Sequence, residues 1–155
     1  MNLPKYLWKV RMESKNNLEK NENKKLKFPP IPVHTEEIAK VILDAAYSVH
    51  STLGPGLLES VYETCLVHEL NLRKIKVQTQ IILPVIYKGM NVDSGYRLDM
   101  LVDDCVIVEI KATEGINPVH CSQLLTYLKL TNTRLGLLLN FNVVHMRDGI
   151  KRIIN

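Results

Sequence analysis

The chain has 155 residues, of which 46% are hydrophobic, and a formal net charge of +4 at pH 7. That length is sufficient for one domain with a hydrophobic core. The sequence shows neither a run of about 20 apolar residues, as a membrane-spanning helix requires, nor the apolar core of a signal peptide. Its three cysteines, an odd number without CxxC spacing, indicate neither a zinc motif nor a disulfide framework. We therefore expect a cytoplasmic protein that does not contact membranes.

The first 34 residues differ in composition from the rest. They hold eight Lys or Arg and three Asp or Glu, which leaves 12 basic and 13 acidic residues for residues 35–155. Residues 13–27 are almost wholly Lys, Asn and Glu, and a proline-rich stretch follows at residues 29–32. We predict a basic arm at residues 1–34, disordered or loosely ordered, and a single domain at residues 35–155. Since the domain itself is nearly neutral, the net charge says little about what it binds.

Two helices are expected at the start of the domain. Residues 35–53 carry apolar side chains at helical spacing, and Thr35 followed by two glutamates is typical of a helix start. The glycines and proline at residues 54–56 end this helix. A second helix is expected over residues 57–73, and its buried face would consist of Leu58, Val61, Tyr62, Cys65, Leu66 and Leu70.

Strand patterns dominate the rest of the chain. Residues 77–87 form the first strand, in which Pro84 favours an edge position or a bulge, and strands around Asp99 and Glu109 complete an antiparallel meander. A helix follows from Asn117 to about Leu130. The apolar run at residues 135–141 is typical of a strand covered on both faces, and a short strand ends the chain at residues 150–154. This order predicts an α/β or α+β fold with helices packed on a sheet.

Three charged residues interrupt the apolar strands of residues 96–111, YRLDMLVDDCVIVEIK. Charged side chains are rarely buried unless they are paired or bound to a metal. Glu109 and Lys111 share one face of their strand, because successive side chains alternate. A two-residue loop at Asp103 and Asp104 would turn Asp99 to the other face, whereas a three-residue loop that includes residue 105 would oppose Asp99 to Glu109. We predict the longer loop or an equivalent bulge, with Asp104 left-handed.

This set of side chains suits metal-assisted hydrolysis of phosphodiesters. Carboxylate oxygens can hold Mg²⁺ or Mn²⁺, the ion acidifies a bound water, and an ammonium group orients the nucleophile or stabilises charge on the phosphate. A buried Asp–Lys or Glu–Lys ion pair is the alternative interpretation. The pattern D-x9-E-x-K is short enough to occur by chance.

Two helical motifs accompany the strand residues: GxxExxY at residues 56–62 and QxxxY at residues 123–127. Each motif puts its polar pair on one helical face. With all four motifs in this order, the chain resembles the PD-(D/E)XK nuclease superfamily from about residue 38 to residue 155. It is most similar to the small GxxExxY protein family in the RecB-like branch. The resemblance implies a restriction-endonuclease-like core, which is a mixed sheet with an antiparallel three-stranded meander flanked by helices.

The same resemblance implies roles for individual residues. Asp99 and Glu109 would hold Mg²⁺ or Mn²⁺ together with the backbone carbonyl of Ile110. Lys111 would position the attacking water or stabilise the transition state. Glu59 would be a further metal ligand or an anchor for Lys111.

The QxxxY helix would supply second-layer groups. Gln123 and Tyr127 would orient the lysine or contact a phosphate. Without the resemblance, the two residues would be interpreted as a polar helix face packed on a sheet edge. His120, one turn earlier, could border the same cleft but is more typical of a helix cap or a surface group. Arg97 is a further candidate for a phosphate contact.

The resemblance thus implies a Mg²⁺- or Mn²⁺-dependent nuclease that acts on DNA or RNA. The alternative is a non-catalytic module that uses the same fold to bind nucleic acid or a protein, which the small size and the neutral domain favour. Hydrolysis of another phosphate-bearing molecule is a third interpretation. Exposed sheet edges would allow a homodimer.

Overall fold

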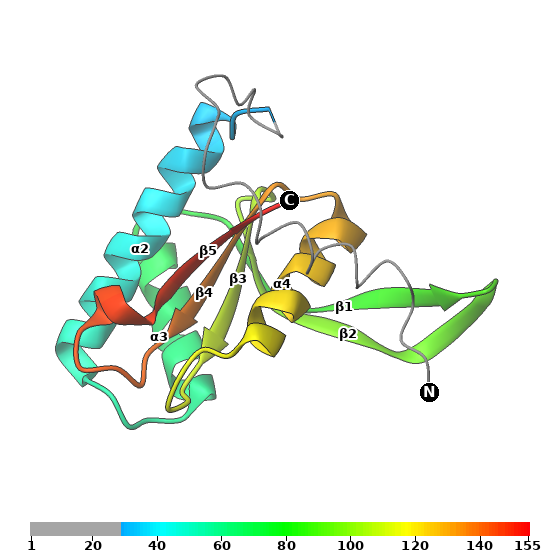
Figure 1. The fold of residues 1–155 in the computed structure, drawn as a ribbon. Helices are drawn as coiled ribbons and strands as arrows, with labels where there is room; N and C mark the ends of the chain where they lie inside the picture. The colour runs from blue at the N-terminus through cyan, green and yellow to red at the C-terminus, as the bar shows by residue number, and fades with distance from the viewer. Residues whose placement is uncertain (1–28) are drawn as a thin grey trace, which may run out of the picture. The chain divides into compact units, whose positions relative to one another are not determined.

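The computed structural model describes residues 29–155, with residues 93 and 94 described by their backbone alone. Most of the expected arm, residues 1–28, lies outside the described residues. The elements are the helices α2 (Val33–Leu53), α3 (Glu59–Leu72) and α4 (Pro118–Thr131), the 3-10 helix η1 (Met146–Gly149), and the strands β1 (Val77–Tyr87), β2 (Met90–Val102), β3 (Val106–Lys111), β4 (Leu135–Asn140) and β5 (Ile150–Ile154) (Figure 1). The predicted order of helices and strands is confirmed, with η1 as an addition.

The strands form one five-stranded mixed sheet in the order β1-β2-β3-β4-β5. The first three strands are the predicted antiparallel meander. β3 and β4 pair in parallel, and α4 makes the crossover that a parallel pair requires. β5 pairs antiparallel with β4 and ends the sheet. The described helices include none that is both long and apolar enough to cross a membrane.

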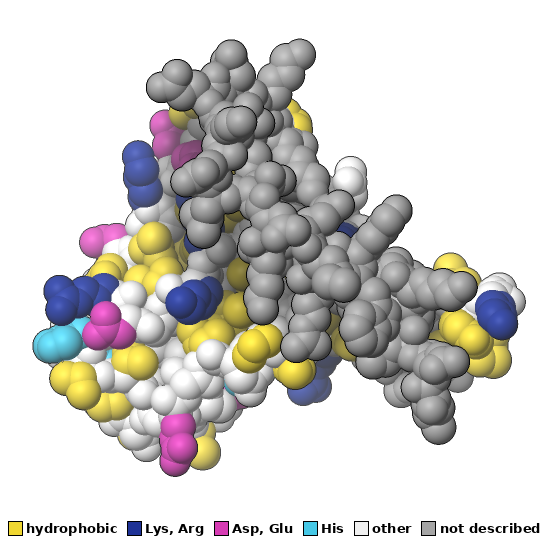
Figure 2. Space-filling view, viewed as in Figure 1, with side chains coloured by type: hydrophobic (Ala, Val, Ile, Leu, Met, Phe, Trp, Pro, Cys, Tyr) yellow, Lys and Arg dark blue, Asp and Glu magenta, His cyan; other side chains and the backbone are white. Residues whose placement is uncertain are grey.

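β1 and β2 form a hairpin that extends past the helices (Figure 1). β1 is an edge strand, and its pairing with β2 shifts between Leu83 and Val85. Pro84 therefore lies both in an edge strand and at a bulge, the two positions that the sequence offered for it. Hydrophobic side chains gather at the far end of this hairpin together with a basic one (Figure 2). Ile86, Tyr87 and Met90 are exposed there.

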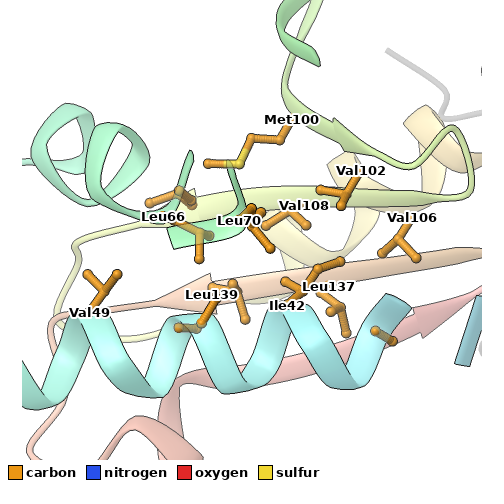
Figure 3. Close-up of a cluster of buried hydrophobic side chains, with 14 of the residues drawn as sticks. Ile42, Val49, Leu66, Leu70, Met100, Val102, Val106, Val108, Leu137 and Leu139 are labelled. Carbon is orange, nitrogen blue, oxygen red and sulfur yellow. The ribbon is translucent and has the colours of Figure 1, made fainter. Parts of the chain in front are cut away.

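One face of the sheet packs against α2 and α3. Leu66 and Leu70 of α3 meet Val108 and Leu139 of the sheet, and Ile42 of α2 lies beside them (Figure 3). A second, smaller cluster forms under α4 on the opposite face. β3 and β4 are therefore covered on both faces, as the apolar run in β4 predicted.

Two details of the helices differ from expectation. α2 begins at Val33 after Pro32, and Thr35 lies buried inside its first turn instead of capping it. Leu58 and Val61, expected in the core, are exposed, Leu58 by 73%. Leu58 precedes the first residue of α3, and the helix turns only the face of Tyr62, Leu66 and Leu70 toward the sheet.

Candidate active site

The register of β2 and β3 decides where the predicted acids lie. The two strands are joined by a three-residue loop at residues 103–105, and the same register continued places Asp99 opposite Glu109. The predicted longer loop is thus confirmed. Asp103 and Asp104 both adopt left-handed conformations, with φ of 47° and 55°, whereas only the second was expected to do so. Aspartate tolerates this conformation better than most residues.

The side chains of β2 change from one face of the sheet to the other at Asp99. Met100 packs with the core under α2 and α3, whereas Leu98 packs with the cluster under α4. Gln80 of β1 lies opposite Asp99 and has a φ of 54°. Neither residue is among the paired positions of the two strands. Because of this irregularity Asp99 is not paired with β1, and its side chain can contact the end of β3.

The open edge of β3 is closed by carboxylates. Asp99 Oδ2 accepts a hydrogen bond from the Ile110 N–H at 2.8 Å, and Glu59 Oε1 accepts one from the Ala112 N–H at 3.1 Å. The Lys111 carbonyl accepts on the other side from the N–H of Phe141, the residue that follows β4. Because backbone groups alternate along a strand, the Ile110 carbonyl faces the same edge as the two carboxylates. Three oxygen-bearing groups from α3, β2 and β3 thus meet at this edge.

Glu109 and Lys111 form a buried ion pair beside this edge. Lys111 Nζ lies 2.8 Å from Glu109 Oε1, and the side chains are 13% and 3% exposed. Glu109 Oε2 is buried and has no hydrogen-bond partner among the described residues. Such an atom is costly unless something compensates its charge.

The pKa values of these residues also show that negative charge is costly at this site. Burial, followed by the charge of Asp99, raises the pKa of Glu109 to about 7, although Lys111 opposes this shift. Burial likewise raises the pKa of Asp99, against the hydrogen bond from Ile110 and the charge of Lys111. For Lys111, burial would lower the pKa, but the hydrogen bond to Glu109 and the surrounding acids outweigh it and raise the value. Lys111 is therefore an ammonium group at neutral pH.

These residues fit a hard divalent cation. Two carboxylates and a backbone carbonyl are the oxygen ligands that Mg²⁺ and Mn²⁺ prefer, and a cation would compensate the uncovered Glu109 Oε2. Within residues 29–155, the one set of three His, Cys, Asp or Glu side chains whose ligand atoms all lie within 4.8 Å of one another is elsewhere, so Glu59, Asp99 and Glu109 are not gathered that tightly.

The QxxxY pair lies on α4. Gln123 Nε2 donates a hydrogen bond to Tyr127 Oη at 2.6 Å, and the buried Tyr127 ring meets Tyr96 edge to face. Burial raises the pKa of Tyr127, although the bond from Gln123 opposes this shift. Neither residue hydrogen-bonds Lys111 within the described chain, so their predicted role toward it stays a prediction. His120 takes part in capping α4, as expected, because its Nδ1 accepts from the N–H of the N-cap residue Asn117 at 3.4 Å.

The GxxExxY motif has a structural explanation. Tyr62 Oη donates to the Gly54 carbonyl at 2.7 Å and accepts from the Leu57 N–H at 3.1 Å, so the tyrosine holds the loop between α2 and α3. Gly56 in this loop has a φ of 99°, which favours glycine. The loop leads directly into Glu59 at the first position of α3. Gly56 and Tyr62 thus fix the position of Glu59.

A cleft of about 780 Å³ opens beside Asp99. Glu59 and Arg97 line it, which is consistent with the suggested phosphate contact of Arg97. Gln80 and Glu63 also line it, and Gln80 Nε2 lies 2.9 and 2.8 Å from the two carboxylate oxygens of Glu63. The sequence alone gave no signal for Gln80 or for its contact with Glu63, since this contact depends on the irregular backbone of β1.

Asn140 is a further residue that the sequence did not single out. It is 1% exposed at the end of β4, where its Oδ1 accepts from the N–H groups of Thr113 and Asn142 and its Nδ2 donates to the Thr113 carbonyl. Lys111 is its neighbour in the sheet. Asn140 therefore fixes the segment that follows Lys111. A polar residue at the end of an otherwise apolar strand was the available signal.

Comparison with known proteins assigns this arrangement to a family. A family model described as the PD-(D/E)XK nuclease superfamily matches residues 36–153. Neither the curated proteins nor the solved structures give a significant match. The matched region contains every candidate residue of the cleft, and the mixed sheet with its flanking helices is consistent with the expected restriction-endonuclease-like fold.

Proposed function

Because this chain belongs to the PD-(D/E)XK nuclease superfamily, we propose that it is a Mg²⁺- or Mn²⁺-dependent nuclease that hydrolyses phosphodiester bonds of DNA or RNA. The observation that carries the proposal is the buried Glu109 Oε2, which has no hydrogen-bond partner within residues 29–155 and lies beside Asp99 and an ammonium group. A metal-free ion pair would leave this oxygen uncompensated. A cation held by Asp99, Glu109 and the Ile110 carbonyl would compensate it.

The side chains divide the work of hydrolysis. The bound ion would supply a Lewis acid that activates water and neutralises charge on the phosphate. Lys111 keeps its proton, because the surrounding acids raise its pKa, so it acts as a hydrogen-bond donor to the water or phosphate and not as a general base. Glu59 accepts a hydrogen bond from the Ala112 N–H at the same strand edge, and it would serve as a further metal ligand or as an anchor for Lys111.

Gln123 and Tyr127 would support the site from α4. The hydrogen bond between them and the burial of the tyrosine ring fix the Tyr127 hydroxyl near the ion pair. The hydroxyl or the Gln123 amide could contact Lys111 or a phosphate once substrate enters.

We assign the chain to the GxxExxY family in the RecB-like branch as part of the same proposal, on the motifs at residues 56–62 and 123–127. Residues 1–34 would then be a basic arm, whose last two residues already belong to α2, and residues 35–155 the nuclease domain. The proposal includes a cytoplasmic location and allows a homodimer through exposed strand edges.

Metal titration combined with a cleavage assay tests this function. Mn²⁺ is titrated calorimetrically into the wild type and the variants Asp99→Ala, Lys111→Ala and Glu37→Ala, and each is assayed on labelled single- and double-stranded DNA and RNA. Asp99→Ala should lose metal binding and cleavage, whereas Lys111→Ala should lose cleavage. Glu37 is an exposed acid on α2, so its variant should match the wild type.

Two results would contradict the proposal. Cleavage at the wild-type rate by Lys111→Ala would remove the lysine from the mechanism. A folded wild type that neither binds Mn²⁺ nor cleaves any substrate would favour the non-catalytic module that binds nucleic acid or a protein.

A further inference from the structure

A second group of potential metal ligands lies at the loop between β2 and β3. His34, Asp103 and Cys105 each offer a ligand atom, and these atoms all lie within 4.8 Å of one another. Asp103 follows Asp99 by four residues, which is about 13 Å along an extended strand. The group is therefore separate from the cleft, and it shares no residue with it.

The fold brings these three residues together from two distant segments. His34 is the second residue of α2, and the left-handed residues of the β2–β3 loop present Asp103 and Cys105 to it. Backbone hydrogen bonds fix the loop, because the Asp103 N–H donates to Lys76 and the Cys105 N–H donates to Val102. Two of the ligands therefore lie on a short loop that backbone hydrogen bonds hold in place, and the third lies in the first turn of α2.

We propose that His34, Asp103 and Cys105 bind a thiophilic divalent transition-metal ion such as Zn²⁺. Imidazole nitrogen, carboxylate oxygen and thiolate sulfur are the protein ligands of zinc, and three of them with a water complete a tetrahedral site. A carboxylate and a thiolate together balance the charge of the ion. When the ion binds, the Cys105 thiol loses its proton to solvent and a metal–sulfur bond forms.

The metal-free geometry needs a small rearrangement. His34 Nε2 lies 2.6 Å from Asp103 Oδ2, whereas ligand atoms around tetrahedral zinc are roughly 3.2–3.8 Å apart. The His34 side chain is 62% exposed, so it can move outward by that amount. Asp104 does not compete for the ion, because its carboxylate is bound to Lys76 and Gln78.

Ligand chemistry separates this site from the cleft. A site with sulfur and imidazole favours Zn²⁺ or Co²⁺, whereas the oxygen ligands of Asp99 and Glu109 favour Mg²⁺ or Mn²⁺. The ion at the loop would join the first turn of α2 to the meander. It would therefore act on stability and not on the chemistry of the cleft.

Cobalt absorption tests the proposal directly. Co²⁺ is titrated into the reduced full-length protein with Mg²⁺ in excess, and the near-ultraviolet charge-transfer band from thiolate to cobalt is recorded. The wild type and Asp99→Ala should both develop the band, to saturation at one equivalent. Cys105→Ser should lose it, and His34→Ala should need at least ten times more Co²⁺. Cys121→Ser, which alters a similarly half-buried cysteine on α4, should keep it.

Thermal unfolding gives a second measurement that does not depend on absorption. Zn²⁺ should raise the Tm of the wild type and of Asp99→Ala, but not that of Cys105→Ser or of Asp103→Ala. Circular dichroism of the metal-free variants shows whether they fold. If Cys105→Ser does not fold, His34→Ala and Asp103→Ala decide the question. Absence of the band in the wild type, or a band that persists in Cys105→Ser, would overturn the proposal.

Discussion

Asp99 Oδ2 accepts a hydrogen bond from the Ile110 backbone N–H at 2.8 Å, at the point where β2 and β3 stop pairing. The carboxylate replaces a strand partner for Ile110, and so fixes the backbone whose carbonyl is a candidate metal ligand. Asp99 therefore has a structural role, and under the proposed function its negative charge would also bind the metal. Substitutions can separate the two roles.

Asp99→Asn should keep the structural duty and lose the electrostatic one. The amide oxygen can still accept from Ile110, so the free energy of unfolding should stay within about 1 kcal/mol of the wild type. Asp99→Ala leaves the Ile110 N–H without a partner and should cost about 1–3 kcal/mol. Both variants should bind Mn²⁺ at least ten times more weakly. Urea unfolding and calorimetry measure the two effects, and wild-type affinity in Asp99→Asn would contradict this division.

Glu109→Gln should stabilise the metal-free protein in a pH-dependent way. The folded-state pKa of Glu109 is about 7, above its ordinary value of 4.5, so its contribution to stability is fully present below pH 4.5 and is lost as the pH rises to 7. Glutamine has no proton to lose. The variant should match the wild type near pH 4.5 and exceed it at pH 8, by up to about 3 kcal/mol.

Urea unfolding in the presence of a chelator, at pH 5 and at pH 8, checks this expectation. Glu37→Gln alters an exposed acid and should have no effect at either pH. Saturating Mg²⁺ should reverse the order at pH 8, because the ion stabilises the ionised wild-type side chain. An equal gain for Glu109→Gln at both pH values would contradict the explanation by ionisation.

Lys111→Met should change the pH dependence of metal binding as well as cleavage. The hydrogen bond and charge of Lys111 lower the pKa of Glu109, so removing them should raise that pKa further. The midpoint of Mn²⁺ affinity against pH should then move upward. Lys111→Arg keeps the charge and should keep the midpoint, but its planar group should not restore full cleavage. Calorimetry over pH 5.5–8.5 measures both, and an unmoved midpoint in Lys111→Met would refute the coupling.

Much of the fold follows from local patterns. The apolar run of β4, the helical periodicity of α2 and the break at Pro84 each reflect a single physical requirement, which the sequence shows directly. Even the register of Asp99 against Glu109 could be derived, because the alternative would bury the two acids on opposite faces. The start of α2 and the exposure of Leu58 could not, since they depend on how the helices meet the sheet.

The site was predictable only in part. The strand acids stand out because they interrupt apolar runs. The contact of Glu59 with Ala112 and that of Gln80 with Glu63 join segments more than 15 residues apart. No periodicity encodes such contacts. The spacing of the cysteines likewise gave no sign that Cys105 would lie beside a histidine on another element.

Tyr62→Phe isolates the role of the tyrosine hydroxyl. The ring stacks on Phe141 with centroids 4.5 Å apart, and phenylalanine preserves this contact. The hydrogen bonds to Gly54 and Leu57 are lost, which should cost about 1–2 kcal/mol. Amide exchange should become faster at Leu57. Tyr47→Phe, at an exposed position of α2, is the matched control, and equal effects of the two variants would argue against a specific hold on the loop.

Asn140→Ala tests whether the segment after Lys111 depends on one buried amide. The substitution leaves the N–H groups of Thr113 and Asn142 and the Thr113 carbonyl without their partner, so it should cost about 2–4 kcal/mol. Asn140→Asp keeps the acceptor but loses the donor and buries a charge, so it should not rescue stability. Asn142→Ala should have a small effect.

The proposed metal ligands Asp99 and Glu109 lie outside this segment, so Mn²⁺ affinity of Asn140→Ala should stay within about threefold of the wild type while cleavage slows. Calorimetry and a cleavage assay on the folded variant separate the two quantities. If affinity fell in parallel with cleavage, Asn140 would support the whole sheet edge. If only cleavage fell, the role of Asn140 would be to fix the segment between Lys111 and α4, because Asn140 binds the backbone of Thr113.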